Sequence, residues 1–192
     1  SLIETTDELK LNRNTQTLQT TSANALQRTN GWIRSEDNVG GTAGTIESKF
    51  AWKIGSGTTG TYSVPFKNTT TGTSVFKLKF AKNVAADSIG VLTVGTYSTA
   101  TNNTPYTFPS LPAGDPLHVI SMLTNPSPVL DATPWTVDRF WYINRTTTGS
   151  ITGTLSFEYD NTVEGTLTSA YVAGEMKAQR YEVSPSDTGW HA

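Results

Sequence analysis

The chain has 192 residues, a net charge of −2 and no cysteine, and 34 of its residues are threonine. This length is sufficient for one domain with a sizeable core. The lack of cysteine excludes disulfides, zinc–thiolate sites and a cysteine nucleophile. The sequence contains no run of Lys or Arg and no apolar stretch long enough to span a bilayer. We therefore expect neither nucleic-acid binding nor membrane insertion.

The composition favours an extracellular β protein. Threonine is β-branched and prefers strands to helices. Charged residues make up only 16% of the chain, against roughly 25% in an average globular protein. Low charge combined with abundant Thr, Gly and Asn predicts a secreted or cell-surface protein rather than a cytoplasmic enzyme.

The first part of the chain, residues 1–26, predicts a strand-like extension ahead of a β-sandwich domain at residues 27–192. Its apolar residues Leu9 and Leu11 stand in short β-like pieces without a helical period. We expect this extension to be free to act as a donor strand for a neighbouring subunit. Leu9 and Leu11 are then the candidate interface residues.

The strongest strand signals follow in residues 49–97, where apolar residues alternate with polar ones. Four segments place their large residues on one face: Phe50, Trp52 and Ile54; Tyr62, Val64 and Phe66; Phe76, Leu78 and Phe80; and Leu92 and Val94. The first two segments predict a hairpin. Pro65 cannot donate to a strand ladder, so it predicts an edge strand or a strand end.

A proline-rich stretch at residues 98–136 predicts a long loop, and strands resume at VDRFWYIN, residues 137–144. Adjacent residues of a strand point to opposite faces, so its three consecutive aromatics cannot form one flat surface. We expect Trp141 to enter the core. Phe140 and Tyr142 should pack under the proline-rich loop or against a neighbouring subunit.

The last strand signals are SITGTLSFEY and MKAQRYEV, and the first of these places Leu155 and Phe157 on one face. In total the pattern predicts about eight to ten strands and little helix. The connections are short, so most pairs should be antiparallel. The expected fold is an all-β antiparallel sandwich of jelly-roll or Ig-like type.

No motif for metal-dependent, serine or phosphate chemistry is present, so we expect no enzyme activity and no cofactor. The carboxylates of Glu158, Asp160 and Glu164 are oxygen ligands suited to calcium. They lack the EF-hand spacing, and an exposed acidic strand end explains them equally simply. Trp135, in the proline-rich loop, is the candidate ring for contacting a ligand such as a sugar. Trp32, Trp52, Trp141 and Trp190 are further aromatic candidates, with the core favoured for Trp52 and Trp141.

The order of several motifs between about residue 16 and residue 190 resembles a β-sandwich module of secreted and cell-surface Bacteroidetes proteins that are associated with type IX secretion. The motifs are GWIRSEDNVGG, ESKFAWKIG, YSVPF, VGTYSTATNNTPY, TVDRFWYIN, SFEYD and KAQRYEV. The resemblance implies an extracellular structural or adhesive role without agreed catalytic residues. Asp87-Ser88-Ile89 also resembles the O-glycosylation motif of that phylum, which implies a glycan on Ser88. Members usually continue past the Gly-Trp pair with one more strand, whereas this chain ends at Ala192.

The sequence therefore leads to two functional hypotheses. In the first, the protein is a non-enzymatic subunit of a surface filament or adhesin, assembled because the extended segment of one chain adds a strand to the next. In the second, it is a carbohydrate-binding module whose partners are glycans. Both hypotheses use the same fold, so the fold alone does not choose between them.

Overall fold

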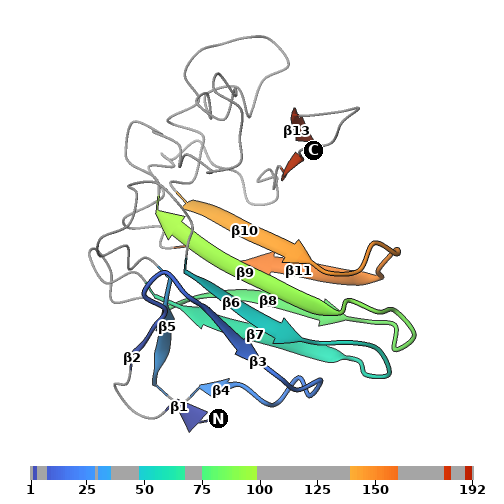
Figure 1. The fold of residues 1–192 in the computed structure, drawn as a ribbon, viewed down its shortest axis with the longest axis horizontal. Helices are drawn as coiled ribbons and strands as arrows, with labels where there is room; N and C mark the ends of the chain where they lie inside the picture. Colours follow the sequence, from blue (N-terminus) through green and yellow to red (C-terminus); the bar gives the residue numbers. More distant parts are fainter. Residues whose placement is uncertain are drawn as a thin grey trace, which may run out of the picture.

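The computed structural model describes residues 2–3, 8–28, 30–35, 48–67, 75–98, 139–159, 180–182 and 189–191, and the statements below concern these residues. Every secondary-structure element in these residues is a strand, which confirms the expected all-β fold. Two larger sheets lie face to face as a sandwich (Figure 1). Two short ladders accompany them, β1 (Leu2–Ile3) with β4 (Gln27–Arg28) and β12 (Arg180–Glu182) with β13 (Gly189–His191).

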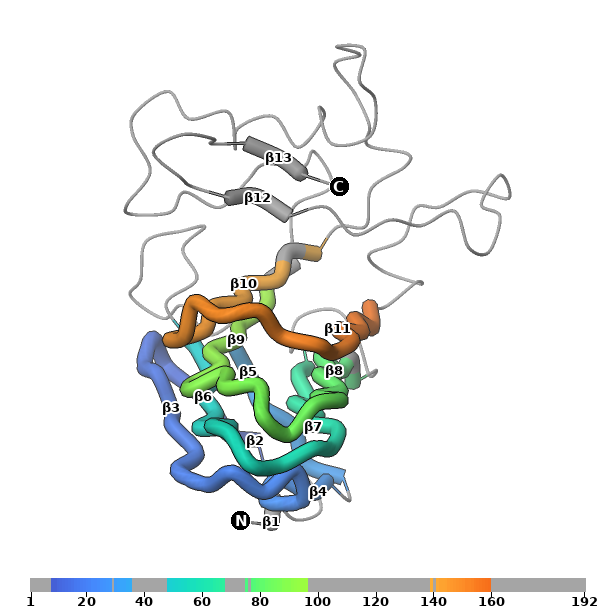
Figure 2. Tube along the Cα trace, turned by 90° about the vertical axis from the view of Figure 1, so that its right-hand side faces the viewer, coloured from blue at the N-terminus to red at the C-terminus, as the bar shows by residue number. Residues whose placement is uncertain are grey.

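The first large sheet has four strands in the order β10-β9-β6-β3, and the second has five in the order β11-β8-β7-β5-β2. The bounds of the first are β10 (Arg139–Arg145), β9 (Val91–Ser98), β6 (Lys49–Lys53) and β3 (Thr15–Leu18). Those of the second are β11 (Gly153–Phe157), β8 (Phe76–Lys82), β7 (Gly60–Phe66), β5 (Trp32–Arg34) and β2 (Glu8–Lys10). Figure 2 shows the two layers from the side.

The sheets are mixed rather than purely antiparallel. The strands from β6 to β11 pair antiparallel with one another, and among these pairs only β7 and β8 are joined by a short connection. The N-terminal strands differ, because β2 pairs parallel with β5 and β3 pairs parallel with β6. β5 also meets β7 in parallel, at the single pair Ile33–Phe66. The parallel pairs arise because strands distant along the chain are brought side by side without a hairpin between them.

Residues 11–14 carry the chain from one sheet to the other. Asn12 and Arg13 have positive φ angles of 46° and 65°, which turn the backbone sharply between β2 and β3. The Leu11 amide donates to the Arg34 carbonyl at 3.2 Å, and the Lys49 amide donates to the Asn14 carbonyl at 3.0 Å. One short segment therefore supplies the edge strand of both sheets, beyond β5 in one and beyond β6 in the other.

The core fills the space between the sheets with the residues that alternation predicts to face inward. Rings of Trp52 and Tyr62 meet edge-on with centroids 5.1 Å apart, and Tyr62 stacks on Phe80 at 6.4 Å. Trp141 packs against this core, which confirms its expected place, and its ring lies 6.0 Å from that of Phe66. The buried apolar side chains are Leu11, Ile33, Phe50, Trp52, Ile54, Tyr62, Val64, Phe66, Leu78, Phe80, Ile89, Leu92 and Val94.

Two local predictions require correction. The hairpin expected between the segment of Phe50 and that of Tyr62 does not form, because β6 pairs with β9 in the four-stranded sheet and β7 pairs with β8 in the five-stranded sheet. Of the two alternatives for Pro65, the edge strand is wrong, because β7 lies between β8 and β5, whereas the strand end agrees with the structure, because β7 ends at Phe66. Pro65 is tolerated because β5 pairs with β7 only at Phe66, so the ladder on that side requires no backbone donor from Pro65. Leu155, which alternation assigns to the same face as Phe157, does not pack against the core as Phe157 does. It is 42% exposed, because β11 is an edge strand.

Candidate functional site

The N-terminal candidates Leu9 and Leu11 lie against the sandwich of their own chain. Leu11 is only 3% exposed and belongs to the core cluster, and Leu9 packs against that cluster from β2. Burying a leucine side chain contributes about 1.5–3 kcal/mol. The segment thus fills a slot between the two sheets. Its transfer to a neighbouring subunit remains a prediction.

Residues 20 and 21 are fixed at one end of the sandwich by core aromatics. The Trp52 indole nitrogen Nε1 donates to the Thr20 carbonyl at 3.0 Å. The Tyr62 hydroxyl donates to the Thr21 carbonyl at 2.8 Å and lies 2.9 Å from the Thr58 hydroxyl. The N-terminal segment is therefore held at two places, by the buried Leu11 and by these two ring hydrogen bonds.

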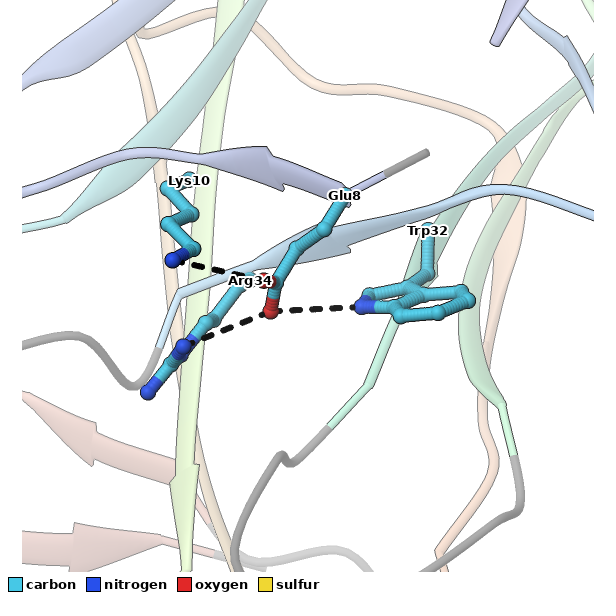
Figure 3. A network of polar contacts seen from close by, with 4 residues as sticks. All are labelled: Glu8, Lys10, Trp32 and Arg34. Atoms are coloured by element: carbon cyan, nitrogen blue, oxygen red, sulfur yellow. Dashed lines mark hydrogen bonds and ion pairs between the residues drawn. The ribbon is translucent and has the colours of Figure 1, made fainter. Parts of the chain in front are cut away.

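A second group of polar and aromatic side chains lies beside the N-terminal strand, and we call Glu8, Lys10, Trp32, Arg34 and Lys67 the Trp32 cluster. Figure 3 shows the first four, which come from β2 and β5. One Glu8 oxygen, Oε1, accepts a hydrogen bond from Trp32 Nε1 at 3.4 Å and lies 3.5 Å from Arg34 Nη1. The other oxygen lies 3.8 Å from Lys10 Nζ. The Lys67 ammonium stands 4.0 Å from the centre of the Trp32 ring.

The cluster faces away from the core because its members alternate with inward residues. Ile33 lies between Trp32 and Arg34 and is fully buried, so the residues on either side point outward. The parallel register places Glu8 beside Trp32 and Lys10 beside Arg34. Two cations, Lys10 and Arg34, thus lie beside the Glu8 carboxylate, and Lys67 stands over the Trp32 ring, so the five residues of the cluster together carry a charge of +2. Among the described residues, Arg34 Nε has no hydrogen-bond acceptor.

Sequence reasoning found Trp32 as a candidate ring but not the four charged residues around it. Glu8-x-Lys10 and Trp32-x-Arg34 each show the spacing of two that places side chains on one strand face. That signal could have identified each half of the cluster. It could not have joined the halves, because the parallel pairing of β2 with β5 has no local sequence signature.

Tyr142 lies on the outer face of the four-stranded sheet, opposite to the core side of Trp141. The Lys49 ammonium lies over the Tyr142 ring, 4.5 Å from the ring centroid. Tyr142 pairs with Gly95, which stands one residue beyond the Phe50–Val94 pair and hence beside Lys49. The missing side chain of Gly95 leaves room for the ring and the ammonium to meet across β9. Phe140 is in β10, but its side chain lies outside the described residues, as does Trp135.

The calcium and glycan candidates are only partly within the described residues. Glu158 already uses both carboxylate oxygens, because Oε1 pairs with Lys79 Nζ at 2.7 Å and Oε2 accepts from the Lys77 amide at 3.1 Å. Asp160 and Glu164 lie outside the described residues, so the calcium site remains a prediction. Ser88 is exposed in the loop between β8 and β9, beside the fully buried Ile89. A glycan on Ser88 likewise remains a prediction.

Within the ranges that the structure describes, no group of three or more His, Asp or Glu side chains gathers as a metal site. The same ranges include no helix of the length and apolarity needed to cross a membrane. The chain was also compared with known protein families, with curated proteins and with solved structures, and none of these comparisons gave a match.

Proposed function

We propose that this protein is a secreted, non-enzymatic structural subunit that assembles into an extracellular filament or adhesin by exchanging its N-terminal strands between copies. The observation that carries the proposal is the placement of β2 and β3. One segment of the chain forms an edge strand in both sheets and inserts Leu11 between them. A segment at two edges can leave without breaking the ladders among the other strands.

Exchange preserves the contacts that the segment makes within one chain. The same backbone ladders and the same Leu11 slot would form with the segment of a second copy, so the difference in free energy is confined to the connecting residues and to association. Domain swapping of an identical element is a low-cost route to assembly for this reason. If each segment enters the next copy in turn, the contact is head-to-tail and generates an open filament.

The connection between the segment and the rest of the chain lies near residues 28–31. The Arg28 side chain forms two hydrogen bonds with the backbone of this connection. Its Nε donates to the Gly31 carbonyl at 2.7 Å and its Nη2 to the Asn30 carbonyl at 3.3 Å. These are local hydrogen bonds that water can replace when the connection extends. We therefore place the hinge of the exchange at residues 28–31, next to the start of β5.

A disulfide that fastens β3 to β6 tests the proposal. Thr17 and Ala51 are register partners on neighbouring strands, and such partners lie about 5 Å apart, within the range that a disulfide spans. The double variant Thr17→Cys/Ala51→Cys, refolded at high dilution under oxidising conditions, should stay a monomer in light scattering. After reduction and concentration it should assemble, and electron microscopy should show fibres.

The unmodified protein, which has no cysteine, is the control for the redox treatment. It should assemble equally with and without reductant. If the oxidised double variant forms the same fibres as the unmodified protein, assembly does not use the N-terminal strands. If the unmodified protein remains a monomer at all concentrations, the assembly function itself is wrong.

A further inference from the structure

The Trp32 cluster contains more positive charge than a structural role for Glu8 requires. Glu8 already joins β2 to β5 through Trp32 and Arg34. Lys10 adds only a long ion pair with Glu8, 3.8 Å between Nζ and Oε2, and its side chain is 50% exposed. Among the described residues, no carboxylate lies within ion-pair distance of Lys67. The cluster therefore presents cations that its single carboxylate does not neutralise.

The second feature of the cluster is the position of an aromatic ring among these cations. Trp32 is half-buried in β5, and the Lys67 ammonium lies 4.0 Å from its ring centre. An anion paired with Lys67 is consequently held next to the indole. Ligands with both a carboxylate and an apolar ring face satisfy both groups at once, because sugar C–H faces pack on aromatic rings while carboxylates pair with Lys and Arg.

We propose that the Trp32 cluster is a binding site for an acidic saccharide, with Trp32 contacting the sugar ring and Lys67, Lys10 and Arg34 receiving its carboxylates. Arg34 contributes positive charge to the site, although its side chain is only 21% exposed and its Nε is buried without an acceptor among the described residues. Lys10, whose side chain is 50% exposed, offers its charge to a carboxylate more directly.

This site does not depend on the exchange of N-terminal strands. Its residues face outward from the five-stranded sheet, and a donated β2 would bring an equivalent Glu8 and Lys10 to the same place. The saccharide should therefore bind both to a monomer and to an assembled form. An acidic peptide would supply carboxylates without the sugar ring, and the experiment below separates the two ligands.

The test is a titration of the full chain with a trimer of galacturonic acid, followed by intrinsic fluorescence and by calorimetry. A neutral glucose trimer and a glutamate trimer are the comparison probes. We expect the uronate trimer to change the Trp fluorescence, and the calorimetric affinity to fall as salt is added. Lys67→Gln should weaken binding about tenfold, the size expected for one lost charged contact. Trp32→Phe should remove the fluorescence change.

Lys53→Gln is the matched control, because Lys53 is an exposed lysine on the other sheet. It should bind the uronate trimer within about twofold of the unmodified protein, as expected for a surface residue outside the site. Equal losses of affinity for the uronate trimer in the Lys67 and Lys53 variants would overturn the assignment of the site. Equal affinity for the glutamate and uronate trimers would overturn the saccharide assignment, and the absence of uronate binding would overturn the proposal as a whole.

Discussion

The hydroxyl of Tyr62 donates a 2.8 Å hydrogen bond to the carbonyl of Thr21, and this contact joins the N-terminal segment to a buried aromatic residue of the core. Tyr62 is 1% exposed and lies in β7, while Thr21 is exposed and follows β3. The bond therefore reaches from the core aromatic cluster to the segment that serves both sheets. Its strength helps to set how readily the segment opens.

We predict that Tyr62→Phe lowers the free energy of unfolding by about 1–3 kcal/mol, because the substitution removes two hydrogen bonds, to the Thr21 carbonyl and with the Thr58 hydroxyl, each of which contributes about 0.5–1.5 kcal/mol. The aromatic packing remains, and water can reach the exposed Thr21 carbonyl, so a larger loss is not expected. Urea unfolding measures this change. Hydrogen exchange should rise in residues 20–26 more than elsewhere.

Tyr142→Phe is the control for that substitution. The Tyr142 ring lies on the outer face under Lys49, and its contact with the ammonium uses the ring rather than the hydroxyl. Its unfolding free energy should stay within about 0.5 kcal/mol of the unmodified protein. Similar losses in the free energy of unfolding of the two variants would show that the Tyr62 hydroxyl has no special role in holding the N-terminal segment.

Gly60→Ala should loosen the same segment through a steric contact. Gly60 has a φ of 144°, and an added Cβ would lie 2.8 Å from the Cβ of Ala23. Unfavourable φ and overlap together should cost about 1–3 kcal/mol. Limited proteolysis should cut the N-terminal segment faster in this variant than in the unmodified protein.

Two further variants separate backbone strain from the overlap with Ala23. Gly57 also has a positive φ, 88°, but an added Cβ there would meet nothing within 4 Å, so Gly57→Ala should cost less. Adding Ala23→Gly to Gly60→Ala removes the overlapping methyl group and should restore part of the stability. No recovery in this double variant would argue against a close contact between Gly60 and residue 23.

Lys82 joins two loops although it is only 2% exposed. Its Nζ donates to the Thr58 carbonyl at 2.6 Å and to the Ala85 carbonyl at 3.0 Å. Lys82→Met keeps an unbranched side chain that is one heavy atom shorter and removes both hydrogen bonds, so we predict a loss of about 1–3 kcal/mol in the free energy of unfolding. Lys53→Met, at an exposed position, should change stability by less than about 0.5 kcal/mol. Thermal unfolding of both variants measures the difference, and equal effects would contradict this role for Lys82.

The sequence predicted the inner faces of the central strands well because their pattern is local. Phe50, Trp52 and Ile54 alternate with other residues, and a period of two determines which side of a strand each residue occupies. The same rule correctly placed Trp141 in the core. It does not predict that Leu155 is 42% exposed, because alternation indicates the face of a strand but not whether the opposite sheet extends far enough to cover it.

The N-terminal half of the architecture was not predictable in the same way. The short strands β2 and β3 pair parallel with strands far along the chain, Glu8 with Trp32 and Thr15 with Lys49. Such pairing depends on tertiary packing rather than on a turn signal. The Trp32 cluster was missed for the same reason, since Glu8 and Trp32 meet only because β2 lies beside β5.

The most direct test of strand exchange is a mixture of two single-cysteine variants, Thr17→Cys and Ala51→Cys, with a size tag on one of them. Neither chain alone can form a disulfide between positions 17 and 51, so this bond between the two chains requires β3 of one copy to lie beside β6 of the other. We predict a disulfide-linked heterodimer on a non-reducing gel after assembly and oxidation. Little of it should form when Thr17→Cys is mixed with Ser56→Cys, which places its thiol in an exposed loop. Fibres in which no disulfide links position 17 of one chain to position 51 of another would contradict the exchange of N-terminal strands.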